Sequence, residues 1–245
     1  MPHFHGTPFG GTRADRQRAL TDRLVLIPYP RPDDLALALR HCRGFIADNG
    51  AYTDWRKGHP TFRGYAGYVA WVEKLQQHPL FHWAVIPDQI GGTEAENNAL
   101  LAQWPAHLRG VPVFHMHHSL DRLRWLAQNY PTVALGGGQG YEQLKSRAWW
   151  ARIDQMMDVL TDEAGRPICQ LHGLRMLDPK VFTVLPLASA DSANAARNSS
   201  HVHRFAPGLS RGERACQLAD RIERNAPATA WKRRTGPHQY ELFGS

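Results

Sequence analysis

Short apolar runs recur along the chain and are separated by longer stretches that carry the start signals of helices. Each run has the length of a buried strand. The predicted strands are Leu24–Pro28, Gly44–Asp48, His82–Asp88, Val111–His117, Thr132–Gly136, Ile168–His172 and Leu185–Asp191. Ser119 before Leu120, and Asp178 before Pro179, are typical of helix starts. The predicted helices are Pro32–Cys42, Tyr65–Gln77, Glu94–His107, Leu120–Asn129, Ala148–Thr161, Pro179–Val184 and Arg211–Asn225.

Strands that alternate with helices predict a parallel sheet with right-handed crossovers. We expect a (β/α)8 barrel, because such a barrel needs about 250 residues and the chain has 245. The eighth strand is expected near His201–Ala206 or at the N-terminus. A doubly wound open sheet is the alternative, although the GxGxxG fingerprint of its dinucleotide-binding form is missing. The whole chain, 1–245, is predicted to be one domain, with an N-terminal segment 1–22 and a basic C-terminal tail 226–245.

Charge and composition narrow the class of protein. The formal net charge is +7, and a basic surface favours phosphate-rich partners such as nucleic acid. The chain has no run of 18 apolar residues, so we expect no membrane span, and no apolar secretory signal at its start. Its three cysteines are far apart, so a reducing, cytoplasmic setting is expected.

Three aspartates lie at the ends of predicted strands, where each apolar run gives way to a loop. They are Asp48 in GFIADNG, Asp88 in HWAVIPD and Asp191 in LPLASAD. A buried carboxylate is costly unless it is paired or used. Because the carboxyl ends of barrel strands form one face, these side chains are expected to converge on an active site.

The residue types suggest chemistry for this face. Two carboxylates beside a sugar carbon are the usual pair for glycosyl transfer, which Asp48 and Asp191 could provide. Asp88 could accept two N–H bonds from a guanine-type edge. The other reading is that each aspartate only caps the turn after it. The glycines of ALGGGQGY, Gly136 and Gly137 among them, would let a ligand approach the backbone.

Histidines offer a different site. His115 and His117 form an H-x-H pattern on one strand, which can hold a metal ion. With His172 and Asp191 they would complete the centre of a metal-dependent hydrolase. Alternatively, one histidine binds substrate and the others pack in the protein.

The chain resembles the tRNA-guanine transglycosylase superfamily. It is most similar to small phage and bacterial relatives linked to 7-deazaguanine modification of DNA. The resemblance covers roughly residues 24–198. It is carried by DNGAYT (48–53), Ile86–Asp88, LGGGQG (135–140), LHGLRML (171–177) and ADSANAARN (190–198).

The resemblance implies a role for each aspartate. Asp191 would be the nucleophile at C1′, Asp48 the general acid and base, and Asp88 the residue that binds the base edge. His117 would stand near the family's base-contacting glutamine, with backbone help from Gly136 and Gly137. The predicted base-binding set is completed by Asn49, Tyr52 and His172. The predicted nucleic-acid contacts are Arg197, Lys232, Arg233 and Arg234.

The implied reaction replaces guanine in nucleic acid with a 7-deazaguanine such as preQ0. The zinc-binding Cys/His segment of the tRNA enzymes is absent, so we expect no cofactor and favour DNA over tRNA. The resemblance places the protein in the cytoplasm, or in the host cytoplasm if it is phage-encoded. It leaves open a homodimer or a partner protein. The metal-dependent hydrolase, and a non-catalytic barrel that only binds nucleic acid, are the rival hypotheses.

Overall fold

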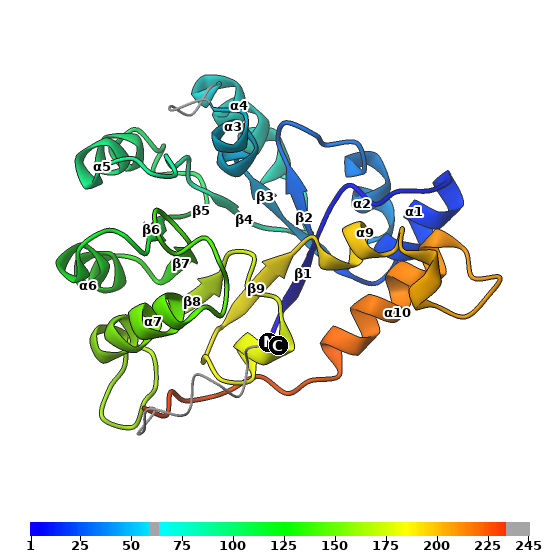
Figure 1. Cartoon of the computed structure of the whole chain (residues 1–245). Helices are drawn as coiled ribbons and strands as arrows, with labels where there is room; N and C mark the ends of the chain where they lie inside the picture. Colours follow the sequence, from blue (N-terminus) through cyan, green and yellow to red (C-terminus); the bar gives the residue numbers. More distant parts are fainter. Residues whose placement is uncertain (59–63, 234–245) are drawn as a thin grey trace.

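A computed structural model describes residues 1–58 and 64–233, and strands alternate with helices along them (Figure 1). The strands are β1 (His3–Gly6), β2 (Leu24–Pro28), β3 (Gly44–Asp48), β4 (Phe81–Val85), β5 (Gly110–Val111), β6 (Val113–His115), β7 (Thr132–Gly136), β8 (Gln170–Gly173) and β9 (Ser189–Ser192). The α-helices are α1 (Arg13–Leu20), α2 (Leu35–His41), α3 (Ala51–Arg56), α4 (Tyr65–Leu75), α5 (Glu94–Ala102), α6 (Leu120–Asn129), α7 (Arg147–Leu160), α8 (Pro179–Phe182), α9 (Asn194–Asn198) and α10 (Arg211–Glu223). A single 3-10 turn, η1, covers Val202–Arg204.

The strands form a parallel sheet that curls into a nearly closed barrel. Their order is β5-β4-β3-β2-β1-β9-β8-β7-β6. The two ends of this order, β5 and β6, are separated in the chain by Pro112 alone. β5 pairs with β4, and β6 pairs with β7. The α/β barrel prediction is therefore confirmed, with one of its eight expected strands divided into two at a proline that has no N–H to donate.

Side chains alternate along each strand between the barrel interior and the helices outside. On β3, Phe45 and Ala47 belong to a cluster that includes residues of α2, α4 and α10, whereas Ile46 packs with interior residues of neighbouring strands. Asp48 continues the interior series, because side chains alternate with a period of two. The same alternation carries Asp191 into the interior at the end of β9.

Three rings from well-separated strands meet inside the barrel. The ring centroid of Trp83 on β4 lies 4.7 Å from that of His172 on β8. Phe4 on β1 lies 6.1 Å from Trp83 and 6.2 Å from His172. These three residues, which we call the aromatic floor, fill the interior below the strand ends that carry Asp48 and Asp191.

Several predicted strands were too long, and prolines explain much of the difference. β4 ends at Val85, so Asp88 lies in a loop beyond Pro87. The strand predicted over Val111–His117 ends at His115 in the structure, because a turn begins there in which His118 N donates to His115 O at 2.9 Å. The prediction Leu185–Asp191 shortens to Ser189–Ser192, since Pro186 and a turn occupy its first half. The prediction Ile168–His172 shifts to Gln170–Gly173.

The missing strand lies at the N-terminus, and three short helices were not predicted. β1 occupies His3–Gly6, and the other candidate, His201–Ala206, contains the 3-10 turn. The unpredicted helices are α1, α3 and α9. Predicted helix Pro32–Cys42 begins only at Leu35, because the Asp34 carboxylate turns away to accept from Phe9 N at 2.7 Å. Within the described residues, no helix combines the length and apolarity needed to cross a membrane.

Candidate functional site

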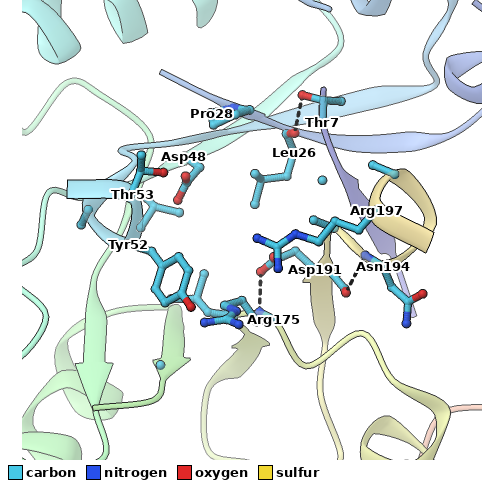
Figure 2. Close-up of a pocket in the computed structure, with 18 of the residues that line it drawn as sticks. Thr7, Leu26, Pro28, Asp48, Tyr52, Thr53, Arg175, Asp191, Asn194 and Arg197 are labelled. Carbon is cyan, nitrogen blue, oxygen red and sulfur yellow. Dashed lines mark hydrogen bonds between the residues drawn. The ribbon is translucent and has the colours of Figure 1, made fainter. Parts of the chain in front are cut away.

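A cavity of about 900 Å³ opens at the carboxyl ends of the strands. Its wall includes Asp48, Asp88, His115, Gly136 and Asp191, which come from β3, β6, β7, β9 and the loop after β4. Figure 2 shows Asp48 and Asp191 on opposite sides of this space, with Tyr52 and Arg175 beside them. The predicted convergence of the three aspartates is therefore what the barrel produces.

Asp48 occupies an electrostatically unfavourable position. Burial, and then the charges of Asp191 and Asp88, raise its pKa from 3.8 to about 7. One hydrogen bond offsets part of this cost, since Gly50 N donates to Asp48 Oδ2 at 3.1 Å. Gly50 has a φ of 83°, a left-handed conformation that glycine adopts without strain. A carboxyl with a pKa near 7 can both give and take a proton at neutral pH.

Asp88 is held by two neighbours. Asn49 Nδ2 donates to its Oδ1 at 2.7 Å, and His115 Nε2 lies 2.9 Å from its Oδ2. His115 Nδ1 lies 3.0 Å from Gly137 O, which can only accept. The Nδ1 atom of His115 therefore donates to that carbonyl, and its Nε2 faces the Asp88 carboxylate.

Asn49 is committed to this framework. Its Nδ2 also donates to Ile86 O at 3.0 Å, and its Oδ1 accepts from Ala51 N at 2.7 Å. With both amide protons and its oxygen engaged, Asn49 positions Asp88 and has little left to offer a base.

Asp191 is fixed by two donors on one oxygen. His172 Nε2 lies 3.2 Å, and Arg175 N 3.1 Å, from Asp191 Oδ1. His172 is fully buried, and its Nδ1 lies 2.8 Å from Ser189 Oγ. Serine, histidine and aspartate thus form a chain in which the carboxylate, not the hydroxyl, reaches the cavity. His172 lies beneath Asp191 in the aromatic floor and is not among the cavity-lining residues of the described chain.

Arg175 was not identified from the sequence. Its φ is 61°, a conformation that L side chains rarely adopt. This turn points its N–H at Asp191, while its guanidinium carbon lies 4.1 Å from the centroid of the Tyr52 ring. Figure 2 shows the stacked pair beside the two catalytic candidates. No feature of the LHGLRML segment distinguishes this arginine from an ordinary surface residue.

The other predicted residues divide between the cavity and elsewhere. Gly136, Gly137, Tyr52 and Arg197 line the cavity. His117 does not belong to the described lining, and its Nε2 lies 3.0 Å from Gly92 O.

The described part of the basic tail, residues 226–233, lies at the opposite end of the barrel. Trp231 N donates to Gly165 O in the loop before β8, and Arg233 pairs with Asp158 near the end of α7. Because barrel helices run antiparallel to the strands, both contacts lie at the amino ends of the strands. Lys232 and Arg233 are therefore remote from the cavity. Arg234 lies outside the described residues.

The four side chains of the metal hypothesis are split into separate contacts. His172 contacts Asp191, His115 contacts Asp88, and His117 contacts Gly92 O. Across residues 1–58 and 64–233, no group of three or more His, Cys, Asp or Glu side chains is placed to hold a metal ion. The four side chains proposed for a metal-dependent hydrolase thus do not meet at one metal-binding position.

The site gathers carboxylates, glycine backbone and a tyrosine ring around one cavity. Its residues come from segments far apart in the chain, which only the barrel brings together. No protein-family model, curated protein or solved structure matches this chain.

Proposed function

We propose that this protein is a base-exchange transglycosylase that replaces guanine in DNA with a 7-deazaguanine such as preQ0. One observation carries the proposal: Asp48, Asp88 and Asp191 line the same cavity at the strand ends, and Asp48 has a pKa of about 7. Base exchange at a sugar carbon needs a nucleophile, a group that moves protons both ways and a group that holds the base. The three carboxylates can supply these roles separately.

In the first step, a carboxylate oxygen of Asp191 attacks C1′ of the target nucleoside. A C1′–O bond forms, the C1′–N9 bond breaks, and its electron pair passes to guanine. Protonated Asp48 gives its proton to the leaving base, so that neutral guanine departs and Asp48 becomes a carboxylate. The sugar stays attached to Asp191 as a covalent intermediate.

In the second step, the incoming base reverses this sequence. Its N9 proton passes to the Asp48 carboxylate, its N9 bonds to C1′, and the C1′–O bond to Asp191 breaks. Asp48 regains the proton that it lost and Asp191 regains its negative charge. Two displacements at C1′ retain the configuration of the glycosidic bond.

The base would be recognised on the side of the cavity that carries Asp88 and Tyr52. Asp88 has carboxylate lone pairs beyond those used by Asn49 and His115, and these can accept N–H bonds from a guanine-type edge. The Tyr52 ring offers a face for stacking. The 7-deazaguanine identity and the choice of DNA rest on the resemblance. A duplex target must be flipped or opened to bring C1′ to Asp191.

An exchange assay tests the proposal. Single-stranded DNA carrying labelled guanine, incubated with the protein and preQ0, should release label and gain the mass of the substituted base. Matched tRNA should not respond. Absence of label release from both nucleic acids would refute the proposed function.

His172 is expected to act through Asp191, as a positioning residue. The change His172→Ala removes a donor to the nucleophile and should lower the turnover rate by about a hundredfold, because small misplacements of reacting groups have effects of that size. The KM for the base should stay near its wild-type value, since His172 lies outside the cavity lining.

Rescue by His172→Gln distinguishes positioning from general packing. Glutamine can present an N–H near the position of Nε2, so this variant should recover part of the rate. Equal rates in the two variants, together with equal thermal stability, would contradict the positioning role.

A further inference from the structure

Charge is unevenly distributed around the cavity. Asp48 and Asp88 lie on one part of its wall, and arginines line another part, near the end of β1. These arginines, which we call the arginine wall, are Arg16, Arg31, Arg197 and Arg211. Figure 1 shows three of the elements that carry them, α1, α9 and α10, together on one side of the barrel.

The guanidinium of Arg211 packs closely against Gly10 at the cavity wall. A Cβ added to Gly10 would lie only 2.1 Å from Arg211 Cζ, so no other residue fits there without moving the guanidinium. Arg211 Nε has a long contact of 3.4 Å to Ser199 Oγ. No carboxylate of the described residues lies within ion-pair distance of this guanidinium.

Only some of the hydrogen-bond donors of the Arg16 guanidinium have a partner in the described part of the chain. Its Nη1 lies 3.3 Å from Oδ1 of the fully buried Asp34. Its Nε is buried and has no hydrogen-bond partner in the described part of the chain. A buried donor without an acceptor is unfavourable, so the interactions available to the Arg16 guanidinium inside the protein are incomplete.

Arg197 brings the arginine wall to the reacting groups. Figure 2 shows its side chain extending from α9 across the cavity toward Asp191. No acidic side chain among residues 1–58 and 64–233 pairs with it at ion-pair distance. Arg31, in contrast, pairs with Asp33 at 3.2 Å and is exposed.

We propose that the arginine wall is a phosphate-binding subsite that takes a phosphate attached to the target nucleoside. This inference rests on the proposed function, which places the base at Asp88 and C1′ at Asp191. A nucleotide held in that way would have its base on the acidic side of the cavity and a phosphate on the basic side. Arg16 and Arg211 lie outside residues 24–198, so the family resemblance assigns them no role.

The chemistry of the wall suits a phosphate group. Guanidinium groups offer several N–H donors in a planar fork that matches phosphate oxygens. The arginines come from three helices and line the same cavity. The subsite would thus favour a phosphorylated nucleoside, and a free nucleoside would leave Arg197 and Arg211 without an anionic partner.

Binding measurements on Arg211→Gln test the subsite without requiring turnover. Four probes are titrated over a range of salt concentrations: guanine, guanosine, guanosine monophosphate and a short single-stranded DNA containing guanine. The variant should bind the DNA about tenfold more weakly, and its log–log salt slope should fall by about one. Guanine and guanosine should bind as they do to the wild type.

The monophosphate arm locates the phosphate. Weaker monophosphate binding by the variant assigns the subsite to the target nucleotide's own phosphate and supports the proposal. A loss confined to DNA would assign these arginines to a neighbouring phosphate of the strand and would contradict it. Unchanged binding of both phosphorylated probes, or an equal loss for free guanine, would overturn it.

Two further variants serve as controls for the Arg211→Gln measurements. Arg233→Gln removes the same charge at the other end of the barrel and should leave all four affinities unchanged. Gly10→Ala keeps every arginine but displaces the Arg211 guanidinium, so it should reproduce the DNA-binding defect if Arg211→Gln proves unstable. These affinities do not depend on exchange chemistry. A protein that failed the exchange assay but showed the Arg211 effect would refute the proposed function and retain the phosphate subsite.

Discussion

The Asp191→Asn variant should fold and bind guanine but lose base exchange by a thousandfold or more. An amide oxygen is a poor nucleophile toward C1′, and removing a covalent nucleophile is among the largest single losses in enzyme catalysis. His172 and Arg175 N can still donate to the amide oxygen, so the fold should survive. Release of labelled guanine measures the rate, and denaturing electrophoresis with labelled DNA shows whether a covalent adduct forms.

Asp121→Asn provides the matched control. Asp121 pairs with Arg124 at 2.8 Å on α6, is exposed, and is not among the cavity-lining residues of the described chain. The same chemical change there should leave exchange close to the wild-type rate. Exchange by Asp191→Asn above a few per cent of wild type would exclude Asp191 as the nucleophile.

The Asp48→Asn variant should lose exchange by roughly a hundredfold to ten-thousandfold, the range typical of general acid–base catalysis. In the wild type, single-turnover release of guanine should fall as the pH rises above about 7, because Asp48 then loses the proton that it donates. The residual guanine release by the variant should not fall as the pH rises above about 7. A wild-type profile that is flat over about one pH unit on either side of the pKa would contradict the assignment.

Measurements of thermal stability show whether the loss of exchange by Asp48→Asn is caused by unfolding. The folded protein holds the Asp48 proton up to about pH 7, whereas the unfolded chain releases it near 3.8. Between these values the folded state binds more protons, so the contribution of Asp48 to stability falls as pH rises and levels off above pH 7. Asp48→Asn has no such decline. Its Tm should exceed that of the wild type at pH 8, by about 2–4 °C for each kcal/mol relieved, and the difference should vanish toward pH 4.

The placement of the strand-end aspartates could be predicted because strand geometry is regular. A buried run such as GFIAD fixes which side chains alternate inward, so Asp48 and Asp191 followed from the pattern. Asp88 was placed on a strand and lies in a loop, yet it reaches the same cavity through its contacts with Asn49 and His115.

Positions set by tertiary contacts could not be predicted in this way. His117 lies only two residues beyond β6, but the turn after His115 directs its ring to Gly92 O. Lys232 and Arg233 look like nucleic-acid contacts by charge, and only the packing of Trp231 shows that they lie at the far end of the barrel. Arg175 depends on a left-handed backbone conformation that its segment does not signal.

The aromatic floor has a consequence for the order of events. Because Phe4, Trp83 and His172 fill the interior beneath Asp191, a base must arrive and depart through the same opening at the strand ends. The outgoing and incoming bases would therefore pass through the same opening, one after the other. Under the proposed base exchange, guanine should then compete with its replacement for the space beside Asp88.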